Sequence, residues 1–161
     1  MDENLQVAPP PDAPRGFHQA RVDEKGRLKL PAALHQFLTG SGYKTLFVTT
    51  LDELTGRLYP IPSWKETEKT LGSAGEDQEA ADALLFLANH YGSDSDVDGQ
   101  GRMLVPKELR QKLEVEDKPV WLIWNSKGRI DMYGEAMYKE KLRDSQAASA
   151  AAMARLKTRG V

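Results

Sequence analysis

The chain has 161 residues, of which 40% are hydrophobic and 29% charged, and it contains no cysteine. This composition is typical of a soluble globular protein with one ordinary domain or two small ones, and it excludes disulfides and thiolate metal sites. The formal net charge of −2 argues mildly against a nucleic-acid partner, unless the basic residues are concentrated in one segment.

The N-terminal segment, residues 1–14, is predicted to form a disordered, proline-rich tail. Its four prolines, Pro9, Pro10, Pro11 and Pro14, oppose helix and sheet and favour the polyproline II conformation. The segment has no signal-peptide pattern, and the longest apolar run of the chain, residues 120–124, is far shorter than the ~20 residues of a membrane helix. We therefore expect a cytoplasmic protein.

The first half of the chain predicts four short strands and two helices. A polar turn at residues 23–27 separates the first two strands, and Pro31 suits the first position of a helix, where its missing N–H costs nothing. Leu34, Phe37 and Leu38 follow Pro31 at helical spacing. The predicted strands are residues 17–22, 28–30, 45–50 and 57–59, and the predicted helices are residues 31–38 and 62–71.

A helix over residues 76–91 is predicted to link the two halves. Its apolar residues recur at helical spacing and form a broad apolar face. Glu76, Asp77 and Glu79 are expected in its first turn, where the helix dipole favours negative charge.

The second half repeats the residue pattern of the first. Residues 97–106 have the same order of residue types as residues 22–31, at an offset of 75, and residues 118–122 match residues 44–48 at an offset of 74. Pro106 is predicted to open a helix that contains Leu109 and Leu113, as Pro31 does in the first half. A last helix is predicted over residues 134–156.

This duplication predicts an α+β fold that is mainly β, with additional helices. Each copy has the order strand, turn, strand, helix, strand, strand, helix, and its four strands are too few to form a sheet without exposed edges. We expect the two copies to pair their exposed sheet edges with each other and so to form one pseudo-two-fold barrel. The expected boundaries are a tail at 1–14, repeat 1 at 15–71, a linking helix at 72–92, repeat 2 at 93–142 and a C-terminal helix and tail at 143–161.

The two turns have opposite electrostatic settings. Residues 15–29 hold five basic residues against two acidic ones, whereas residues 93–105 hold one basic residue, Arg102, against three acidic ones. A phosphate backbone is attracted to the first segment and repelled by the second. We therefore expect repeat 1 to face DNA. The candidate DNA-binding residues are Arg15, Arg21, Lys25, Arg27 and Lys29.

Within each turn the aspartate and the glycine have an expected structural role. The carboxylate can accept hydrogen bonds from backbone N–H groups and from the arginine four residues later, and glycine allows a positive φ. For Arg27 two interpretations stay open, a structural pair with the aspartate or a contact with phosphate or a base edge. The expected structural turn residues are Asp23, Gly26, Asp98, Gly101 and Arg102.

Four landmarks, in this order, resemble the bacterial MraZ family. They are Arg15-Gly16, residues 23–28 (DEKGRL), residues 58–64 (LYPIPSW) and residues 98–106 (DGQGRMLVP), and the similarity spans residues 15 to about 142. MraZ proteins are tandem members of the SpoVT–AbrB superfamily of swapped-hairpin barrels, so the resemblance implies a barrel built from both repeats.

The resemblance also implies a function. Family members assemble into rings and regulate transcription by binding short direct repeats upstream of the division and cell-wall gene cluster, including their own promoter. The implied partners are double-stranded DNA and further copies of the same chain, in a cytoplasmic, nucleoid-associated protein. No cofactor, membrane or small-molecule substrate is expected.

The sequence contains no pattern of a catalytic or metal site. The three histidines, His18, His35 and His90, have no metal-ligand spacing, and no serine or glycine motif of a nucleophile or phosphate loop occurs. An enzyme is not expected. The alternative function is that of an oligomeric, antitoxin-like protein that binds a protein partner through its C-terminal helix.

Overall fold

The computed structural model describes residues 12–161, which form eight strands and five α-helices. The predicted α+β class is therefore confirmed. Most of the predicted proline-rich tail lies outside the described residues, and residues 12–14 have no regular secondary structure. No helix in residues 12–161 has the length and apolar character needed to cross a membrane.

The order of elements in the first half recurs in the second. The first half contains β1 (His18–Arg21), β2 (Arg27–Lys29), α1 (Ala32–Gly40), β3 (Thr45–Thr49), β4 (Gly56–Pro60) and α2 (Ile61–Leu71). The second contains β5 (Ser93–Asp96), β6 (Arg102–Leu104), α4 (Lys107–Lys112), β7 (Pro119–Asn125), β8 (Arg129–Gly134) and α5 (Glu135–Leu156). Between the halves lie the 3-10 turn η1 (Gly75–Asp77) and α3 (Gln78–Tyr91), and η2 (Lys157–Arg159) follows α5.

The helices that follow the turns begin one residue later than predicted, because each proline occupies the cap position before the helix. Pro31 and Pro106 have extended ψ values of 148° and 145°, and α1 and α4 start at the next residue. Leu34 of α1 and Leu109 of α4 are fully buried. Proline fixes φ near the helical value and has no N–H to leave unpaired, so it starts each helix at a defined residue.

The two halves interlock through their strands. The six-stranded antiparallel sheet has the order β1-β7-β8-β4-β3-β5, so the first strand of each half pairs with the third strand of the other half. The second strands, β2 and β6, pair with each other in a separate two-stranded ribbon. This pairing relates the halves by a pseudo-two-fold axis between β8 and β4, and it leaves neither half with a complete sheet of its own.

The main hydrophobic core is shared by both halves. It contains fully buried residues from β2, α1 and β4 of the first half and from β6, α4, β7 and β8 of the second. Burying one such Leu, Ile or Met side chain is worth about 1.5–3 kcal/mol, so each half depends on the apolar surface of the other. The fully buried members include Leu28, Leu34, Leu58, Leu109, Leu122, Ile130 and Met132.

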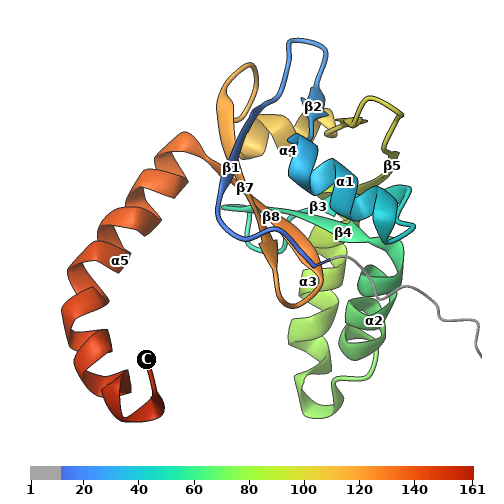
Figure 1. Ribbon diagram of the computed structural model, residues 1–161. Helices are drawn as coiled ribbons and strands as arrows, with labels where there is room; N and C mark the ends of the chain where they lie inside the picture. The colour runs from blue at the N-terminus through green and yellow to red at the C-terminus, as the bar shows by residue number, and fades with distance from the viewer. Residues whose placement is uncertain (1–11) are drawn as a thin grey trace, which may run out of the picture.

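Helices α2 and α3 form a helical arm (residues 61–91) that extends from the sheet (Figure 1). Trp64 of α2 packs on Phe47 and Tyr59 of the sheet, with ring centroids 4.6 and 5.0 Å apart. The predicted apolar face of α3 is buried in part: Ala81, Ala88 and Tyr91 are buried, and Leu84, Leu85 and Leu87 are half-buried. The arm projects beyond the sheet, so the sheet covers only the part of α3 nearest to it.

The linking helix also begins later than predicted. Residues 75–77 form the 3-10 turn, and α3 starts at Gln78, whose side chain accepts from Ala74 N–H (2.9 Å) and donates to Leu71 O (2.8 Å). Glu76 and Asp77 therefore lie before the helix, and only Glu79 is in its first turn.

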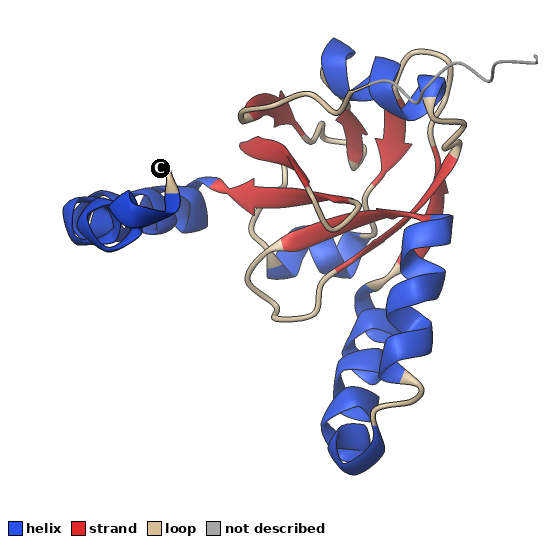
Figure 2. Ribbon diagram, turned by 60° about the horizontal axis from the view of Figure 1, so that its bottom comes forward, coloured by secondary structure: helices blue, strands red, loops and turns tan. Residues whose placement is uncertain are grey.

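Helix α5 leaves the sheet in a different direction from the helical arm. Figure 2 shows α5 on one side of the strands and the arm on another. The N-terminal end of α5 is anchored because Tyr138 stacks on Trp121, with centroids 4.6 Å apart, and Phe17 packs edge-on against Tyr138. Residues 139–161 are all exposed.

Candidate nucleic-acid interface

Turn 1, residues 23–27, is organised by the carboxylate of Asp23. Its Oδ1 accepts hydrogen bonds from the backbone N–H groups of Lys25 (2.9 Å) and Arg27 (2.8 Å), and its Oδ2 forms an ion pair with Arg27 Nε at 3.1 Å. Gly26 has a φ of 82°, in the left-handed region that favours glycine. The hydrogen bond from the Arg27 backbone, opposed by some burial, lowers the pKa of Asp23 below its ordinary value.

Turn 2, residues 98–102, has the same pattern. Asp98 Oδ1 accepts from the N–H groups of Gln100 and Arg102, both at 2.9 Å, and Oδ2 pairs with Arg102 Nε at 3.2 Å. Gly101 has a φ of 79°. The backbone of Arg102 lowers the pKa of Asp98, again against some burial. The hairpin geometry therefore does not distinguish the two turns.

Each turn is packed against a helix of the other half. The guanidinium of Arg110, in α4, lies so close to Gly26 that a Cβ at this position would overlap it, and Arg110 Nη1 donates to Val105 O at 2.6 Å. In the other half, His35 of α1 covers Gly101, where a Cβ would lie 3.0 Å from the imidazole Nδ1. Turn 1 thus gains a cation from the second half of the chain.

Arg110 is a residue that the sequence prediction missed. A signal for it was present, because Arg110 stands 75 residues after His35, the same offset that relates the two turns. Each turn packs against a helix of the other half because strands of the two halves pair with each other. The offset alone does not reveal this pairing.

The ribbon of β2 and β6 presents basic residues on its outer face. Leu28 and Met103 lie opposite each other and are buried, so the neighbouring opposite pairs, Arg27 with Leu104 and Lys29 with Arg102, point to the other face. Arg102, predicted only as a structural turn residue, therefore lies beside Lys29. Leu104 interrupts this face with a side chain that is 53% exposed.

The other predicted residues are placed differently. The exposed Lys25 lies in turn 1, whereas β1 separates Arg15 from the turn. Arg21, at the end of β1, is engaged by Asp117, with its Nε 3.2 Å from Oδ1 and its Nη2 donating to the backbone oxygen at 2.7 Å. The structure therefore groups Lys25, Arg27 and Arg110 at turn 1. It places Lys29 beside Arg102 of turn 2, Arg15 apart and Arg21 in an ion pair.

Positions related by the offset of 75 show how the charge differs. Lys25 corresponds to Gln100, Lys29 to Leu104, and Arg110 to His35. The acidic Asp94 and Asp96 of β5 add negative charge near turn 2, and Asp96 accepts a hydrogen bond from Thr45 Oγ1 at 2.7 Å. The described residues thus combine one turn geometry with two charge settings. Turn 1 has Lys25 and Arg110, whereas turn 2 has the two acidic residues of β5 and one neighbouring lysine, Lys29.

No protein-family model matches the chain, but curated relatives do. "Transcriptional regulator MraZ" of Acidobacterium capsulatum is 30% identical over 128 residues, which cover 80% of this chain and 86% of the relative. The protein of the same name from Halorhodospira halophila is 32% identical over 144 residues, covering 88% and 93%. That of Koribacter versatilis is 35% identical over 103 residues, covering 63% and 70%.

The chain belongs to the MraZ family. This membership confirms the resemblance carried by the two turns and by residues 58–64. The aligned part includes most of the described residues, since the match to the Halorhodospira halophila protein covers 88% of the chain.

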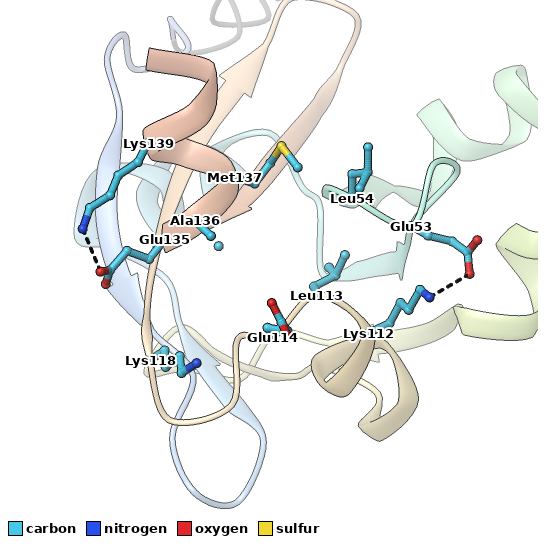
Figure 3. A pocket seen from close by; sticks show the side chains of 11 residues that line it. Glu53, Leu54, Lys112, Leu113, Glu114, Lys118, Glu135, Ala136, Met137 and Lys139 are labelled. Atoms are coloured by element: carbon cyan, nitrogen blue, oxygen red, sulfur yellow. Dashed lines mark hydrogen bonds and ion pairs between the residues drawn. The ribbon is translucent and has the colours of Figure 1, made fainter. Parts of the chain in front are cut away.

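This MraZ-family chain also has a pocket at the root of α5, away from both turns (Figure 3). It is lined by residues of α4, the start of α5 and the loops beside them. Four of its charged side chains form ion pairs, Glu135 with Lys139 at 3.0 Å and Glu53 with Lys112 at 3.7 Å. Within residues 12–161, no group of three or more His, Cys, Asp or Glu side chains is arranged to hold a metal ion.

Proposed function

We propose that this chain is a sequence-specific DNA-binding transcriptional regulator that contacts DNA through turn 1. Its targets are short direct repeats at its own promoter, upstream of the division and cell-wall gene cluster, and it binds them as a ring of identical chains. The observation that carries the proposal is the pairing of one hairpin geometry with two charge settings. Among residues 12–161, turn 1 has Lys25 and Arg110, whereas Gln100 and His35 hold the equivalent positions at turn 2.

Arg27 is the proposed base-contacting residue. Its Nε is held by Asp23 at 3.1 Å, which fixes the direction of the guanidinium. Within residues 12–161, its two terminal nitrogens have no hydrogen-bond partner, so they are free for two acceptors on a guanine edge. Such a bidentate contact discriminates against a wrong base by about 1–3 kcal/mol.

The surrounding cations have a different proposed role. Lys25 and Lys29 are exposed and fit contacts with phosphates, which position the protein without reading sequence. Arg110 packs against Gly26 of turn 1 and adds positive charge. Arg15 and Arg21 are outlying contacts in this proposal, and Arg21 must leave Asp117 to reach a phosphate.

A ring is part of the proposal because one basic turn binds DNA weakly. Several copies of turn 1, spaced to match the repeats on DNA, increase the affinity through effective concentration. This explains how a chain with a net charge of −2 can bind DNA tightly. The proposed location is the nucleoid in the cytoplasm, and no catalytic reaction is assigned.

The test is a titration of the full-length protein against DNA with short G-rich direct repeats, at several salt concentrations. We expect tight binding that weakens as the repeats are removed or moved out of register. The logarithm of the binding constant should fall steeply with the logarithm of salt, with a slope of about −0.9 for each phosphate contact. Equal binding to scrambled DNA, or no binding by an intact oligomer at low salt, contradicts the proposal.

The exposure of residues 139–161 favours a second function, that of an antitoxin-like protein that binds a protein partner through α5. In that case an intact oligomer fails to recognise direct repeats, and substitutions on α5 abolish capture of the partner while the mass of the oligomer stays unchanged.

A further inference from the structure

Helix α5 has no packing partner over most of its length. It contains no buried residue, and every residue from 139 to 161 is exposed. Most of the stability of a helix in a protein comes from packing one of its faces against other elements. The distal part of α5 is therefore a surface that another element is expected to cover.

The large apolar residues of distal α5 lie on one face. At 100° per residue, Leu142, Met153 and Leu156 fall within an arc of roughly 60°. Their side chains are 45%, 54% and 38% exposed. The rest of this segment includes the alanines at 147–148 and 150–152, which let another helix approach closely.

The helical arm has a matching surface. Phe86 of α3 is 76% exposed, the highest value among the large hydrophobic side chains of the described residues. It lies at a shallow hollow lined by Asp82, Leu85, Phe86, Asn89 and His90. An aromatic side chain this exposed, beside a hollow with another apolar wall, is typical of a site where a partner binds.

The two surfaces carry opposite charges. Residues 135–161 hold six basic residues (Lys139, Lys141, Arg143, Arg155, Lys157 and Arg159) and three acidic ones. The helical arm holds six acidic residues (Glu66, Glu68, Glu76, Asp77, Glu79 and Asp82) and two basic ones. Electrostatic complementarity of this kind orients partners and raises the rate of association.

We infer that distal α5 of one chain docks on α3 of the helical arm of a second copy, with Phe86 against the face of Leu142, Met153 and Leu156. Figures 1 and 2 show α5 and the arm leaving the sheet in different directions, so the docking joins neighbouring copies. The contact is heterologous, and head-to-tail repetition closes a ring when the rotation allows it. The inference rests on one part of the proposed function, the ring of identical chains, for which it supplies the contact.

The test compares two full-length variants with complementary defects. The arm variant is Phe86→Glu, and the helix variant combines Leu142→Glu with Met153→Glu. All three positions are exposed, so circular dichroism and urea unfolding should match those of the unmodified protein. By light scattering, we expect each variant alone to fall from the oligomer to a single chain of 17.9 kDa.

Mixing the two variants decides between heterologous and α5–α5 contacts. The arm variant has an unmodified α5, and the helix variant has an unmodified helical arm. One α5 can therefore dock on one arm in a 1:1 mixture, which should form a pair of twice the single-chain mass. An unmodified protein that is a single chain, variants that keep the full mass, or a mixture that stays at the single-chain mass overturns the inference.

The outcome is separable from that of the proposed function. Arg27→Ala should abolish recognition of the repeats without changing the mass, whereas the docking variants should change the mass and keep turn 1. If the docking variants keep the full mass while Arg27→Ala loses DNA binding, the docking is wrong and the proposed function stands. If the masses change as expected but the unmodified protein does not bind the direct repeats specifically, the proposed function is wrong and the docking stands.

Discussion

Turn 1 and turn 2 have hydrogen bonds whose lengths agree to within 0.1 Å, and the arginine of each is paired with the aspartate four residues earlier. They differ in what surrounds them. Turn 1 has Lys25 and Arg110, whereas the equivalent positions at turn 2 are Gln100 and His35. The comparison shows that hairpin shape and surface charge vary independently in a duplicated fold, so a turn motif alone does not identify a DNA-binding turn.

The largest expected difference between the turns is in stability. Gly26→Ala adds a Cβ in the left-handed region and displaces the Arg110 guanidinium from its hydrogen bond to Val105 O, whereas Gly101→Ala places the Cβ 3.0 Å from the His35 ring. We expect Gly26→Ala to lower the free energy of unfolding by about 2 kcal/mol and Gly101→Ala to lower it by about 1 kcal/mol. Urea unfolding of both variants checks this order, and equal losses would show that Arg110 does not constrain turn 1.

The residues behind the turns should differ in their effect on DNA binding. Arg110→Ala removes a cation and the hydrogen bond to Val105 O, which together hold turn 1 in place. We expect a loss of about tenfold in DNA affinity, since a hydrogen bond from a charged group is worth about 1.5 kcal/mol. His35→Ala is the matched control at turn 2 and should leave the affinity unchanged. A larger loss for His35→Ala would reverse the assignment of the turns.

A smaller effect is expected for the exposed lysines. Lys25→Ala and Lys29→Ala should each weaken binding to all DNA sequences alike and reduce the salt slope by about 1, as for the loss of one phosphate contact. Gln100→Ala is the control for Lys25 and should change neither quantity. The converse experiment, Gln100→Lys, gives turn 2 the exposed lysine of turn 1 and should raise non-specific affinity.

The smallest difference is expected in the response to acid, where the turns should behave alike. Hydrogen bonds from the turn backbone, those of Arg27 and Arg102 first, lower the folded-state pKa values of Asp23 and Asp98. Their stabilising effect is fully present above the unfolded pKa of about 3.9 and is lost as the pH falls through the lower folded pKa. Urea unfolding of Asp23→Asn and Asp98→Asn between pH 6 and pH 2 should show equal losses that shrink below pH ~4.

Local sequence features predicted much of this fold. Pro31 and Pro106 marked the starts of α1 and α4, and the β-branched and aromatic run at 45–50 marked β3. The polar residues of β5 (Ser93–Asp96) give no local indication of a strand, because aspartate and serine disfavour strands, and the internal repeat alone predicted it. This strand forms at the sheet edge, where pairing with β3 supplies the hydrogen bonds.

The candidate site was predictable only in part. The excess of basic residues near turn 1 is a property of consecutive residues, so the sequence shows it directly. The contact of Arg110 with Gly26 and the position of Arg102 beside Lys29 depend on pairing between the halves. The ion pair of Arg21 with Asp117 joins residues 96 positions apart, and no local pattern indicates it.

The most direct test of the account compares Arg27→Ala with Arg102→Ala. The two arginines have the same pairing with aspartate, so both variants should lose a similar, small stability of about 0–1 kcal/mol, as exposed ion pairs do. In a titration with direct-repeat DNA, we predict that Arg27→Ala abolishes sequence-specific binding and that Arg102→Ala retains it. Equal losses of specific binding, or a loss confined to Arg102→Ala, would contradict the claim that turn 1 is the DNA-reading element.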